Sequence, residues 1–425
     1  MKDIYVLFGG YTAERQVSVM TGTNVWLKLR NSKHFKPHPF LLAPDKTVWP
    51  TPYTLALSHT VEEIWHNCQN AQNMYRKIKP FAEEIQEKLG FKTTKCLSES
   101  YKTEPLSLEQ FIALAKHNNA FVFIGLHGGM GENGKLQKML EDANIPHNGS
   151  KASASEICMD KFKTAHVLSE NSSSIQGLPK ITLDLEQGLS ETENIWLNAI
   201  KQFENISSTI IIKPRYDGCS AGIVRLYNSN DLSTYLDLIK QKVPFIPENT
   251  ITNQVSIVEI SPETGTEFLL EPFIETDQIS IDNTQLKHQI TTGWIELTVG
   301  VLEHNGIYHS LNPSITVTTS HVLTVEEKFQ GGTGVNLTPP PESIISKTQT
   351  QKICLEIEKA SRLLGIKNYA RLDIFFNHKT DQLVLIEANS LPALTPSTVI
   401  YHQALAENPP LTPRMFLEKL IQQAS

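Results

Sequence analysis

Apolar runs followed by glycines mark two strands in the first part of the chain. The first run, Ile4–Phe8, ends at Gly9, and the second, FVFIGL from Phe121, leads into the glycine-rich segment HGGMGENG. A helix is predicted after each, over SVMTGTNVWLKL and after the second glycine segment. The second helix repeats its apolar residues at i, i+3, i+4 and i+7, at Leu136, Met139, Leu140 and Ala143. Strand, glycine loop and helix in this order predict a parallel α/β sheet with its ligand edge at the carboxyl ends of its strands.

Residues 50–110, between these two strands, follow a different pattern. They are rich in Asn, Gln and Lys and contain a single glycine, Gly90. This composition predicts a mostly helical insertion at the rim of the first domain, to which we assign no function.

From Lys151 onwards the pattern predicts α+β structure. The helical segment KASASEICMDKFKTAHVL precedes STIIIKPRYDGCSAGIVRLYN, which has the form of a strand, a glycine loop and a second strand. Further strands are predicted in EFLLEPFIET and on both sides of a turn at Asn305 and Gly306. From about Pro341 a long apolar-faced helix leads to the strands YARLDIFFN and QLVLIEANS and to a closing helix near PRMFLEKLIQQ. Antiparallel strands with few helices are typical of an α+β lobe.

Composition and charge narrow the class of protein. A chain of 425 residues is too long for one compact core, so two or three domains are expected. The net charge of -7 and the pI near 6.1 argue against a nucleic-acid binder, which would show a basic face. The apolar runs are too short for a signal peptide or a membrane span, so we expect a cytoplasmic protein without a membrane partner. The five cysteines are scattered, which indicates neither a disulfide framework nor a zinc site.

Polar residues on two neighbouring apolar strands are the first candidates for chemistry. Asp373 lies within RLDIFF, and Glu387 and Asn389 end the next strand. Residues two apart in a strand point to the same face, so Glu387 and Asn389 project together. Any one of the three alone would be interpreted as a strand end facing water. Together, two carboxylates and an amide oxygen form the oxygen set that Mg²⁺ takes, and a metal accounts for acids whose unpaired burial would cost several kcal/mol.

Two lysines of the second region could bind the polyphosphate that such a metal accompanies. Lys213 ends the strand TIIIK and leads into PRYDGCSAG, a loop whose Gly218 and Gly222 let backbone N–H groups approach an anion. No GK[ST] follows, so this is not a Walker A loop. Lys161, in MDK on the preceding helix, is the second candidate. Either lysine alone is more often a surface residue, and the glycine loop alone could be a hairpin turn.

Six segments together resemble, in order, the motifs of D-alanine-D-alanine ligases, members of the ATP-grasp superfamily. They are LFGGYTAERQVSVMTG, GLHGGMGENGKLQKMLEDANIPHNGS, SASEICMDK, IIKPRYDGCSAG, ARLDIFF and IEANSLPALT. The resemblance spans most of the chain except residues 50–110 and about 275–293.

The resemblance implies an ATP-grasp fold, α/β and α+β, with three domains. Residues 1–150 would form an N-terminal α/β substrate-binding domain, 151–275 a central lobe and 276–425 a C-terminal lobe with the catalytic centre. ATP would be held between the second and third domains.

The resemblance also implies a residue set for the metal and the phosphates. Asp373, Glu387 and Asn389 match the ligands of the Mg²⁺ bound to ATP, a site that Mn²⁺ can also fill. Lys161 and Lys213 match the phosphate-binding lysines.

Three further matches lie on the nucleoside side of ATP. Glu271 in LLEPFI resembles the acid that faces the exocyclic amine of adenine, and Ile274 would lie along the backbone edge of the base. Glu296 in WIELTVGVL resembles the acid that binds the ribose hydroxyls, although about twenty inserted residues separate it from the hinge.

The resemblance also implies which residues bind the amino-acid substrates. Glu14 in TAER matches the acid that pairs with the ammonium of the first D-alanine, and His127 in GLHGG lies beside it. Arg371 matches the arginine that stabilises charge on the reacting carboxylate. Thr398 stands where the family usually has a serine that binds the second substrate's carboxylate, and Ala393 replaces a usual glycine while keeping an N–H for an oxyanion hole.

The implied reaction has two steps. The γ-phosphate of ATP passes to the carboxylate of the first D-alanine, and the amine of the second D-alanine attacks the resulting acyl phosphate to form the peptide bond. Because an acyl phosphate hydrolyses readily, water must be kept out. We predict a lid near residues 326–338, within EEKFQGGTGVNLTPPP, with Lys328 reaching the phosphates when it closes.

Two departures from the family pattern keep alternatives open. A glutamate, a serine of the glycine loop and a lid tyrosine form a hydrogen-bonded link in the family, and the matching positions here are Glu14, Cys219 and Phe329. A thiol is a weak donor and phenylalanine has none, so this link is weaker. The phenylalanine also resembles family members that join D-alanine to D-lactate.

The first interpretation is a ligase that makes D-alanyl-D-alanine for peptidoglycan precursors. Because of these departures, two other interpretations stay open. One is a ligase for D-lactate or another D-amino acid, and the other is a nucleotide-binding relative with an impaired second step. A non-catalytic binder has no need of the arginine, the two lysines and the three metal residues together. The family is commonly dimeric, so a homodimer is a further expectation.

Overall fold

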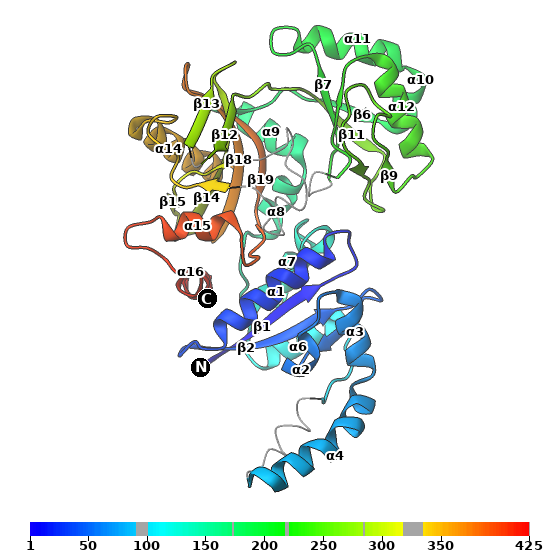
Figure 1. Cartoon of the computed structure of the whole chain (residues 1–425), viewed down its shortest axis with the longest axis vertical. Helices are drawn as coiled ribbons and strands as arrows, with labels where there is room; N and C mark the ends of the chain where they lie inside the picture. The colour runs from blue at the N-terminus through cyan, green and yellow to red at the C-terminus, as the bar shows by residue number, and fades with distance from the viewer. Residues whose placement is uncertain (91–100, 172–173, 217–220, 284, 318–334, 425) are drawn as a thin grey trace. The chain divides into compact units, whose positions relative to one another are not determined.

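The computed structural model of the chain describes residues 1–90, 101–171, 174–216, 221–283, 285–317 and 335–424. The chain forms two compact units, which are described separately below (Figure 1). The first unit comprises residues 1–152, 391–401 and 411–425, and the second comprises residues 153–390 and 402–410. The expected division into three domains stays a prediction.

The first unit is built on a four-stranded sheet of order β3-β2-β1-β4. Strand β1 (Lys2–Gly9) pairs in parallel with β2 (Phe35–Leu42) and β4 (Phe121–Ile124), as the strand, loop and helix pattern predicts. Strand β3 (Val48–Pro50) adds an antiparallel edge. Helices α1 (Arg15–Leu29) and α7 (Lys135–Asp142) follow the two glycine segments. Gly22 allows α1 to lie against β1, because a Cβ at Gly22 would meet the Phe8 Cβ at 2.2 Å.

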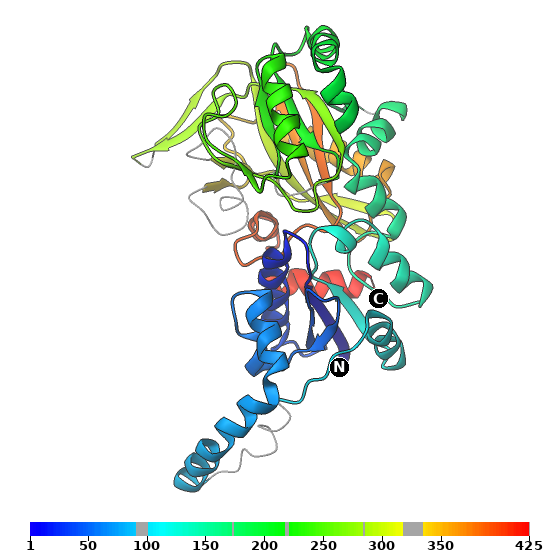
Figure 2. The ribbon, with the colours of Figure 1, turned by 90° about the vertical axis from the view of Figure 1, so that its right-hand side faces the viewer.

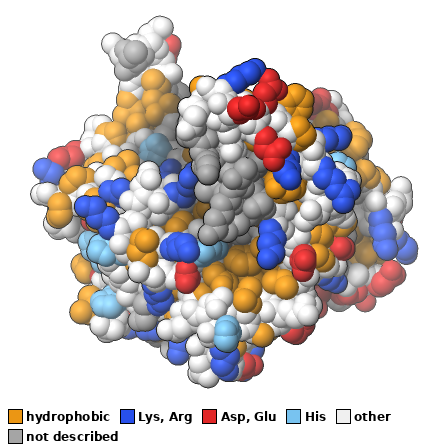
Figure 3. Space-filling model, turned by 90° about the horizontal axis from the view of Figure 1, so that it is seen from below, with side chains coloured by type: hydrophobic (Ala, Val, Ile, Leu, Met, Phe, Trp, Pro, Cys, Tyr) orange, Lys and Arg blue, Asp and Glu red, His pale blue; other side chains and the backbone are white. Residues whose placement is uncertain are grey.

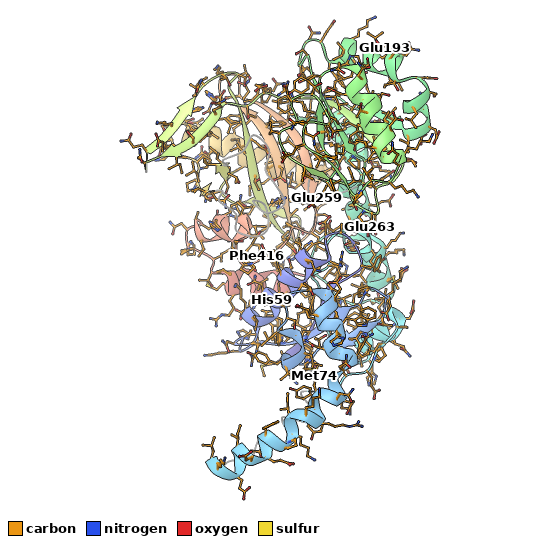
Figure 4. All side chains as sticks on the ribbon, turned by 45° about the vertical axis from the view of Figure 1, so that its right-hand side comes forward. His59, Met74, Glu193, Glu259, Glu263 and Phe416 are labelled. Atoms are coloured by element: carbon orange, nitrogen blue, oxygen red, sulfur yellow. The ribbon has the colours of Figure 1, made fainter. Side chains whose placement is uncertain are left out.

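Four helices lie in the described part of residues 50–117. They are α2 (Tyr53–Ala56), α3 (Val61–Gln69), α4 (Ala71–Leu89) and α6 (Leu108–His117). Helix α3 begins with a capping box, in which the Thr60 side chain accepts from the Glu63 N–H and the Glu63 carboxylate accepts from the Thr60 N–H. Helix α4, with Met74 near its start in Figure 4, extends away from the sheet of its own unit.

The end of the chain completes the first unit. Helix α16 (Pro413–Gln423) packs through Phe416, labelled in Figure 4, against the ring of Tyr401 in α15 (Val399–Leu405). A short 3-10 turn, η1 (Gly129–Gly131), lies within the second glycine segment.

The second unit contains two larger sheets, of which the first is a four-stranded antiparallel sheet of order β6-β11-β7-β8. Its strands are β6 (Ile181–Asp184), β7 (Ile210–Pro214), β8 (Val224–Leu226) and β11 (Glu267–Pro272). Three helices cover one face of it and share its apolar core: α10 (Leu185–Ser190), α11 (Thr192–Phe203) and α12 (Ser229–Lys240). A two-stranded pair, β9 (Phe245–Ile246) and β10 (Val258–Glu259), adjoins it.

The second sheet has the order β15-β14-β18-β19-β5. Its strands are β14 (Trp294–His304), β15 (Ile307–Ser310), β18 (Tyr369–Asn377), β19 (Gln382–Asn389) and β5 (Ile175–Gly177). The predicted turn between β14 and β15 is present, with positive φ at Asn305 and Gly306. Helices α8 (Ala152–Met159), α9 (Lys161–Glu170) and α14 (Lys347–Leu363) contribute side chains to its core.

Two small antiparallel pairs complete the second unit. One is β16 (Ile315–Val317) with β17 (Val335–Leu337), and the other is the hairpin β12 (Gln278–Asp282) with β13 (Gln285–Gln289). The hairpin extends away from the sheet of its unit in Figure 2 and occupies the segment where the sequence resemblance is interrupted.

The distribution of charged side chains on the surface agrees with the sequence composition. On the face drawn in Figure 3, lysine and arginine side chains are interspersed with acidic and apolar ones. Among the helices that the structure describes, none combines the length and the apolar character needed to cross a bilayer.

Candidate active site

Strand register brings the polar side chains of β18 and β19 together. Asp373 lies opposite Glu387, and Arg371 lies opposite Asn389. The Asp373 Oδ2 accepts hydrogen bonds from Arg371 Nη2 at 3.0 Å and from Asn389 Nδ2 at 3.1 Å. Thr298 on β14 donates through Oγ1 to Asp373 Oδ1 at 2.7 Å. The two acids, the amide and the arginine that the sequence singles out therefore form one constellation.

A β-bulge explains how an apolar strand ends in outward-facing polar residues. Ile374 pairs with Leu385, while the preceding residue of β18 pairs with Glu387, so Ile386 is an extra residue in β19. Leu385 belongs to the buried core of this sheet before the bulge, and Ala388 belongs to it afterwards. The alternation has shifted by one residue, and Glu387 and Asn389 consequently point away from that core.

The arrangement fits a divalent cation. Carboxylates directly opposite one another on neighbouring strands repel, and a cation between them removes this cost. Asn389 Nδ2 also lies 3.4 Å from Glu387 Oε1, and rotating the amide by half a turn would present its oxygen instead. Asp373 is buried, whereas Glu387 and Asn389 are half-buried, so an ion bound here would remain accessible to a ligand oxygen. Two carboxylates and an amide oxygen suit Mg²⁺.

A buried ion network surrounds Glu271 on β11. The Glu271 Oε2 lies 2.8 Å from Lys213 Nζ, and its Oε1 accepts a hydrogen bond from Lys180. Lys213 lies on β7 opposite Leu269, so Lys213 and Glu271 are diagonal neighbours on one face of the sheet. The side chains of Glu271, Lys180 and Lys213 are all at most 5% exposed. Two ammonium groups around one carboxylate give this network a net positive charge.

Burial and charge determine the protonation of this network. Burial lowers the pKa of Lys180 to about 8, an effect that Glu271 opposes and that Lys213 and Lys161 increase. Burial would raise the pKa of Glu271, but the two lysines outweigh it and the net shift of the pKa is downward. At neutral pH Lys180 and Glu271 are both charged, which makes the network suited to an anionic ligand.

The start of α9 positions Lys161 near the same network. The Asp160 carboxylate caps the helix by accepting from the Phe162 and Lys163 N–H groups, at 3.0 Å and 3.2 Å. Arg215 binds that carboxylate in a bidentate manner, at 2.9 Å and 2.7 Å, and these donors lower the pKa of Asp160 against the effect of its burial. Lys161, the first residue of α9, is 8% exposed.

A small apolar cluster lies on the opposite side of the second sheet from its main core. It consists of Leu178, Ile274 and Val384, with Trp294 and Phe375 packed against it. Ile274 follows Glu271 by three residues along the hinge after β11. Glu296 is exposed on β14 and projects to the same face as Thr298, two residues later. An apolar surface beside a hinge, with an acid further along the sheet, could hold the base and sugar of a nucleotide.

In the first unit, His127 is held through both ring nitrogens. Its Nδ1 lies 2.9 Å from Glu132 Oε1, and its Nε2 lies 2.9 Å from Thr21 Oγ1. The His127 N–H donates to Ser18 Oγ at 2.8 Å, and its carbonyl accepts from Thr12 Oγ1 at 2.9 Å. The histidine is buried and its ring orientation is fixed by α1 and by the second glycine segment.

Glu14 lies beside the same glycine segment. A Cβ added to Gly128 would lie 3.4 Å from Glu14 Oε1 and 3.1 Å from Thr12 Oγ1. Gly128 also has a φ of +69°, so a side chain at this position would be strained as well as crowded. The structure thus places Glu14 next to Gly128, the residue that follows His127.

The segment after β19 is anchored to α1. The Leu394 N–H donates to Thr21 Oγ1 at 3.2 Å, and Asn24 Nδ2 donates to the Leu394 carbonyl at 2.7 Å. Thr398 donates its hydroxyl proton to the Ala393 carbonyl at 2.8 Å. Both Ala393 and Thr398 are buried. To donate to a carboxylate, the Thr398 hydroxyl must rotate away from Ala393.

Some predicted site residues lie outside the described part of the chain. They are Cys219 in the glycine loop and Lys328 and Phe329 in the predicted lid. Their proposed roles stay predictions.

Sequence reasoning did not single out Lys180, Thr298, Thr21 or Glu132. Lys180 immediately precedes β6 in LPKITLD, and a lysine just before a strand carries no motif. Thr298 follows Glu296 at strand spacing, which is the one signal that could have indicated it. Thr21 and Glu132 become recognisable only through their contacts with His127.

Comparison with known families finds similarity at both ends of the chain. The family description "D-ala D-ala ligase N-terminus" matches residues 3–150, and "D-ala D-ala ligase C-terminus" matches residues 269–422.

Comparison with individual proteins finds relatives over nearly the whole length. The D-alanine--D-alanine ligase of Leptospira interrogans is 25% identical over 411 residues, covering 96% of this chain and 94% of the relative. That of Lacticaseibacillus casei is 25% identical over 404 residues, covering 95% and 91%.

Among solved structures, the D-alanine-D-alanine ligase from Coxiella burnetii has a TM-score of 0.64 at 17% identity, covering 100% of this chain and 95% of that one. The VanG D-Ala:D-Ser ligase from Enterococcus faecalis has a TM-score of 0.65 at 19% identity, covering 100% and 99%. These two likenesses describe the fold.

Proposed function

The chain belongs to the D-alanine-D-alanine ligase family, and from this premise we propose which of its residues carry out the reaction. It is an ATP-dependent ligase that forms the carbon–nitrogen bond of D-alanyl-D-alanine, a building block of peptidoglycan. The metal, the individual site residues and the second substrate are the subjects of the proposal.

We propose Asp373, Glu387 and Asn389 as the ligands of a Mg²⁺ ion. The observation that carries this assignment is the cross-strand pairing of Asp373 with Glu387, two acids held face to face with Asn389 beside them. When bound, the ion would neutralise phosphate charge during phosphoryl transfer. Thr298 and Arg371 fix the orientation of Asp373 through hydrogen bonds to its two oxygens.

The nucleotide is assigned to the lysine network and to the apolar cluster. Lys161, Lys180 and Lys213 supply buried positive charge for the phosphates of ATP. Adenine is assigned to the surface of Ile274 and its apolar neighbours, and the ribose hydroxyls to Glu296. Glu271, whose oxygens are engaged by Lys180 and Lys213, holds these ammonium groups in place as well as bordering the base.

The amino acids are assigned to residues of the first unit. Glu14 pairs with the ammonium of the first D-alanine, and His127 borders it with a ring fixed by Thr21 and Glu132. Thr398 and the Ala393 N–H are assigned to the second substrate and to the oxyanion.

In the first step an oxygen of the D-alanine carboxylate attacks the γ-phosphorus, and the bond from phosphorus to the bridging oxygen of ADP breaks. In the second step the neutral amine of the other D-alanine attacks the carbonyl carbon, inorganic phosphate leaves, and the amine loses a proton. Arg371 stabilises negative charge on the oxygens that bear it in both steps. The protein's main contributions are positioning and charge neutralisation.

The test is an assay of purified protein with ATP, Mg²⁺ and D-alanine, following phosphate release and the mass of the product. We expect D-alanyl-D-alanine. Parallel reactions with D-alanine plus D-lactate or D-serine examine the second substrate, because Phe329 and Cys219 depart from the family pattern. An ester formed only with D-lactate would reassign the second substrate, and ATP binding without turnover would contradict the proposed catalytic set.

A further inference from the structure

Asp277, His288 and His378 form a cluster outside the ATP and D-alanine residues. Asp277 immediately precedes β12, His288 lies on β13, and His378 lies in the turn between β18 and β19. The Asp277 Oδ2 lies 3.0 Å from His288 Nε2 and 3.0 Å from His378 Nε2. All three possible ligand atoms lie within 4.8 Å of one another.

The carboxylate of Asp277 is oriented by the backbone. Its Oδ1 accepts from the N–H groups of Thr291, Thr292 and Gly293, at 2.9 Å, 2.9 Å and 2.8 Å. These bonds leave Oδ2 directed at the two imidazoles, and the carboxylate is fully buried. A carboxylate that binds a metal through one oxygen usually accepts hydrogen bonds from surrounding donors at its other oxygen.

Apolar packing contributes little to the position of the hairpin that carries His288. Nearly every residue of β12 and β13 is exposed, and only Ile279 and His288 are half-buried. An isolated two-stranded hairpin is marginally stable in water. The cluster connects this hairpin, through Asp277 and His288, to the turn at His378 that joins the two strands of the catalytic acids.

We propose that Asp277, His288 and His378 bind a divalent transition-metal ion of the zinc class, which fastens the hairpin to the turn between β18 and β19. Two imidazole nitrogens and one carboxylate oxygen suit Zn²⁺ rather than Mg²⁺, and water would complete a tetrahedron. Ligand atoms at about 2.0–2.2 Å from a tetrahedral ion lie roughly 3.3–3.6 Å apart, a few tenths of an ångström more than the two 3.0 Å separations seen here. The histidine side chains are 13% and 14% exposed, which leaves access for an ion.

The experiment measures Zn²⁺ bound by the full-length protein after metal removal, with excess Mg²⁺ present to occupy the catalytic acids. We expect one equivalent of Zn²⁺ and a higher melting temperature for the unsubstituted protein, and the loss of both in His288→Gln and His378→Gln. His304→Gln, which removes an exposed histidine of β14, is the matched control and should behave like the unsubstituted protein. Co²⁺ should report the same site through its visible absorption.

Two outcomes would overturn this assignment. One is that the unsubstituted protein takes up no Zn²⁺ or Co²⁺ in the presence of Mg²⁺, which would make the cluster a hydrogen-bonded clamp only. The other is that both histidine variants, shown by circular dichroism to be folded, bind the ion as the unsubstituted protein does. Neither outcome affects the ligase assignment, because no readout involves turnover.

Discussion

Several charged residues of the second unit are buried, and they lie in groups with compensating partners. Glu271 is surrounded by Lys180 and Lys213, Asp160 is held by Arg215, and Asp373 accepts three hydrogen bonds. Each group lowers the cost of burying charge, and the group of Glu271, with two ammonium groups around one carboxylate, keeps a net positive charge for a ligand to match. Single substitutions therefore affect ligand binding and stability in different directions.

Glu387→Gln illustrates this difference. The change keeps the size of the side chain and removes one of two facing carboxylates, so we expect turnover to fall by at least about 100-fold. Without Mg²⁺ the variant should melt at the same temperature as the unsubstituted protein or higher, because a repulsion has been removed. Glu342→Gln, a change at an exposed residue, is the control. Near-normal turnover in Glu387→Gln would remove Glu387 from the metal site.

Lys180 predicts a pH dependence of ATP binding. Burial lowers its pKa from 10.5 to about 8, so the folded protein loses this proton as the pH rises through about 8, whereas the unfolded chain keeps it until about 10.5. Between these values the unfolded state binds more protons, and this group's contribution to the free energy of unfolding increases with pH. Over the same window the ATP site loses a positive charge, so the KM for ATP should rise.

Kinetics between pH 7 and 10 check this expectation. Lys180→Arg keeps the charge and should flatten the rise in KM, whereas Lys201→Arg on the exposed face of α11 should reproduce the unsubstituted profile. A KM that stays constant with pH in the unsubstituted protein would contradict the assignment of Lys180 to the nucleotide.

Helices and strands could be predicted from hydrophobic periodicity where their residues pack locally. The glycine segments, the turn at Asn305 and the strands of Asp373 and Glu387 were predictable from the sequence. The parallel pairing of β5 with β19 was not, because the partners are about 200 residues apart and β5 has only three residues. The bulge at Ile386 was also not predictable, since an apolar run gives no signal for one extra residue.

Helix α1 and the segment after β19 act as one structural element through Asn24. Asn24→Ala would leave the Leu394 carbonyl without its 2.7 Å donor and should cost about 1–3 kcal/mol of stability. If residues 393–398 bind the amino acid, the KM for D-alanine should rise while the KM for ATP stays unchanged. Steady-state kinetics in each substrate measure both.

Val25→Ala is the matched control on the same helix. It removes buried apolar volume and so also lowers stability, but it does not touch Leu394. An equal rise of the D-alanine KM in both variants would show that loss of stability alone accounts for the effect.

At the scale of the whole molecule, each unit has its own apolar core. The parallel pairing in the first unit and the largely antiparallel strands of the second could be inferred from the order of strands and helices, whereas the number of sheets could not. The site residues could be assigned only where motif spacing was informative, as for Asp373 and Glu387. Lys180 and the cluster at Asp277 depend on contacts between distant segments, which no local pattern encodes.

Three thiols, of which Cys68 and Cys158 are buried and Cys354 is half-buried, can report the unfolding of each unit. Burial raises the pKa of Cys68, Cys158 and Cys354 to about 12, so each is a protonated, unreactive thiol at pH 8. We expect alkylation of these residues in the native protein to be much slower than in urea, with Cys68 reporting the first unit and the other two the second. Peptide mass spectrometry measures the rates, and equal rates in native and unfolded protein would contradict this expectation.

Ile386 is one residue more than the ladder between β18 and β19 needs. In a regular ladder that kept this residue, Ile386 would lie opposite Asp373, and Glu387 and Asn389 would turn towards the apolar layer. A chain lacking Ile386 would instead keep Leu385 and Ala388 in the core and Glu387 opposite Asp373, so it should retain the proposed metal site. Deletion of Ala388, after the bulge, should turn Asn389 towards the apolar layer and remove it from that site.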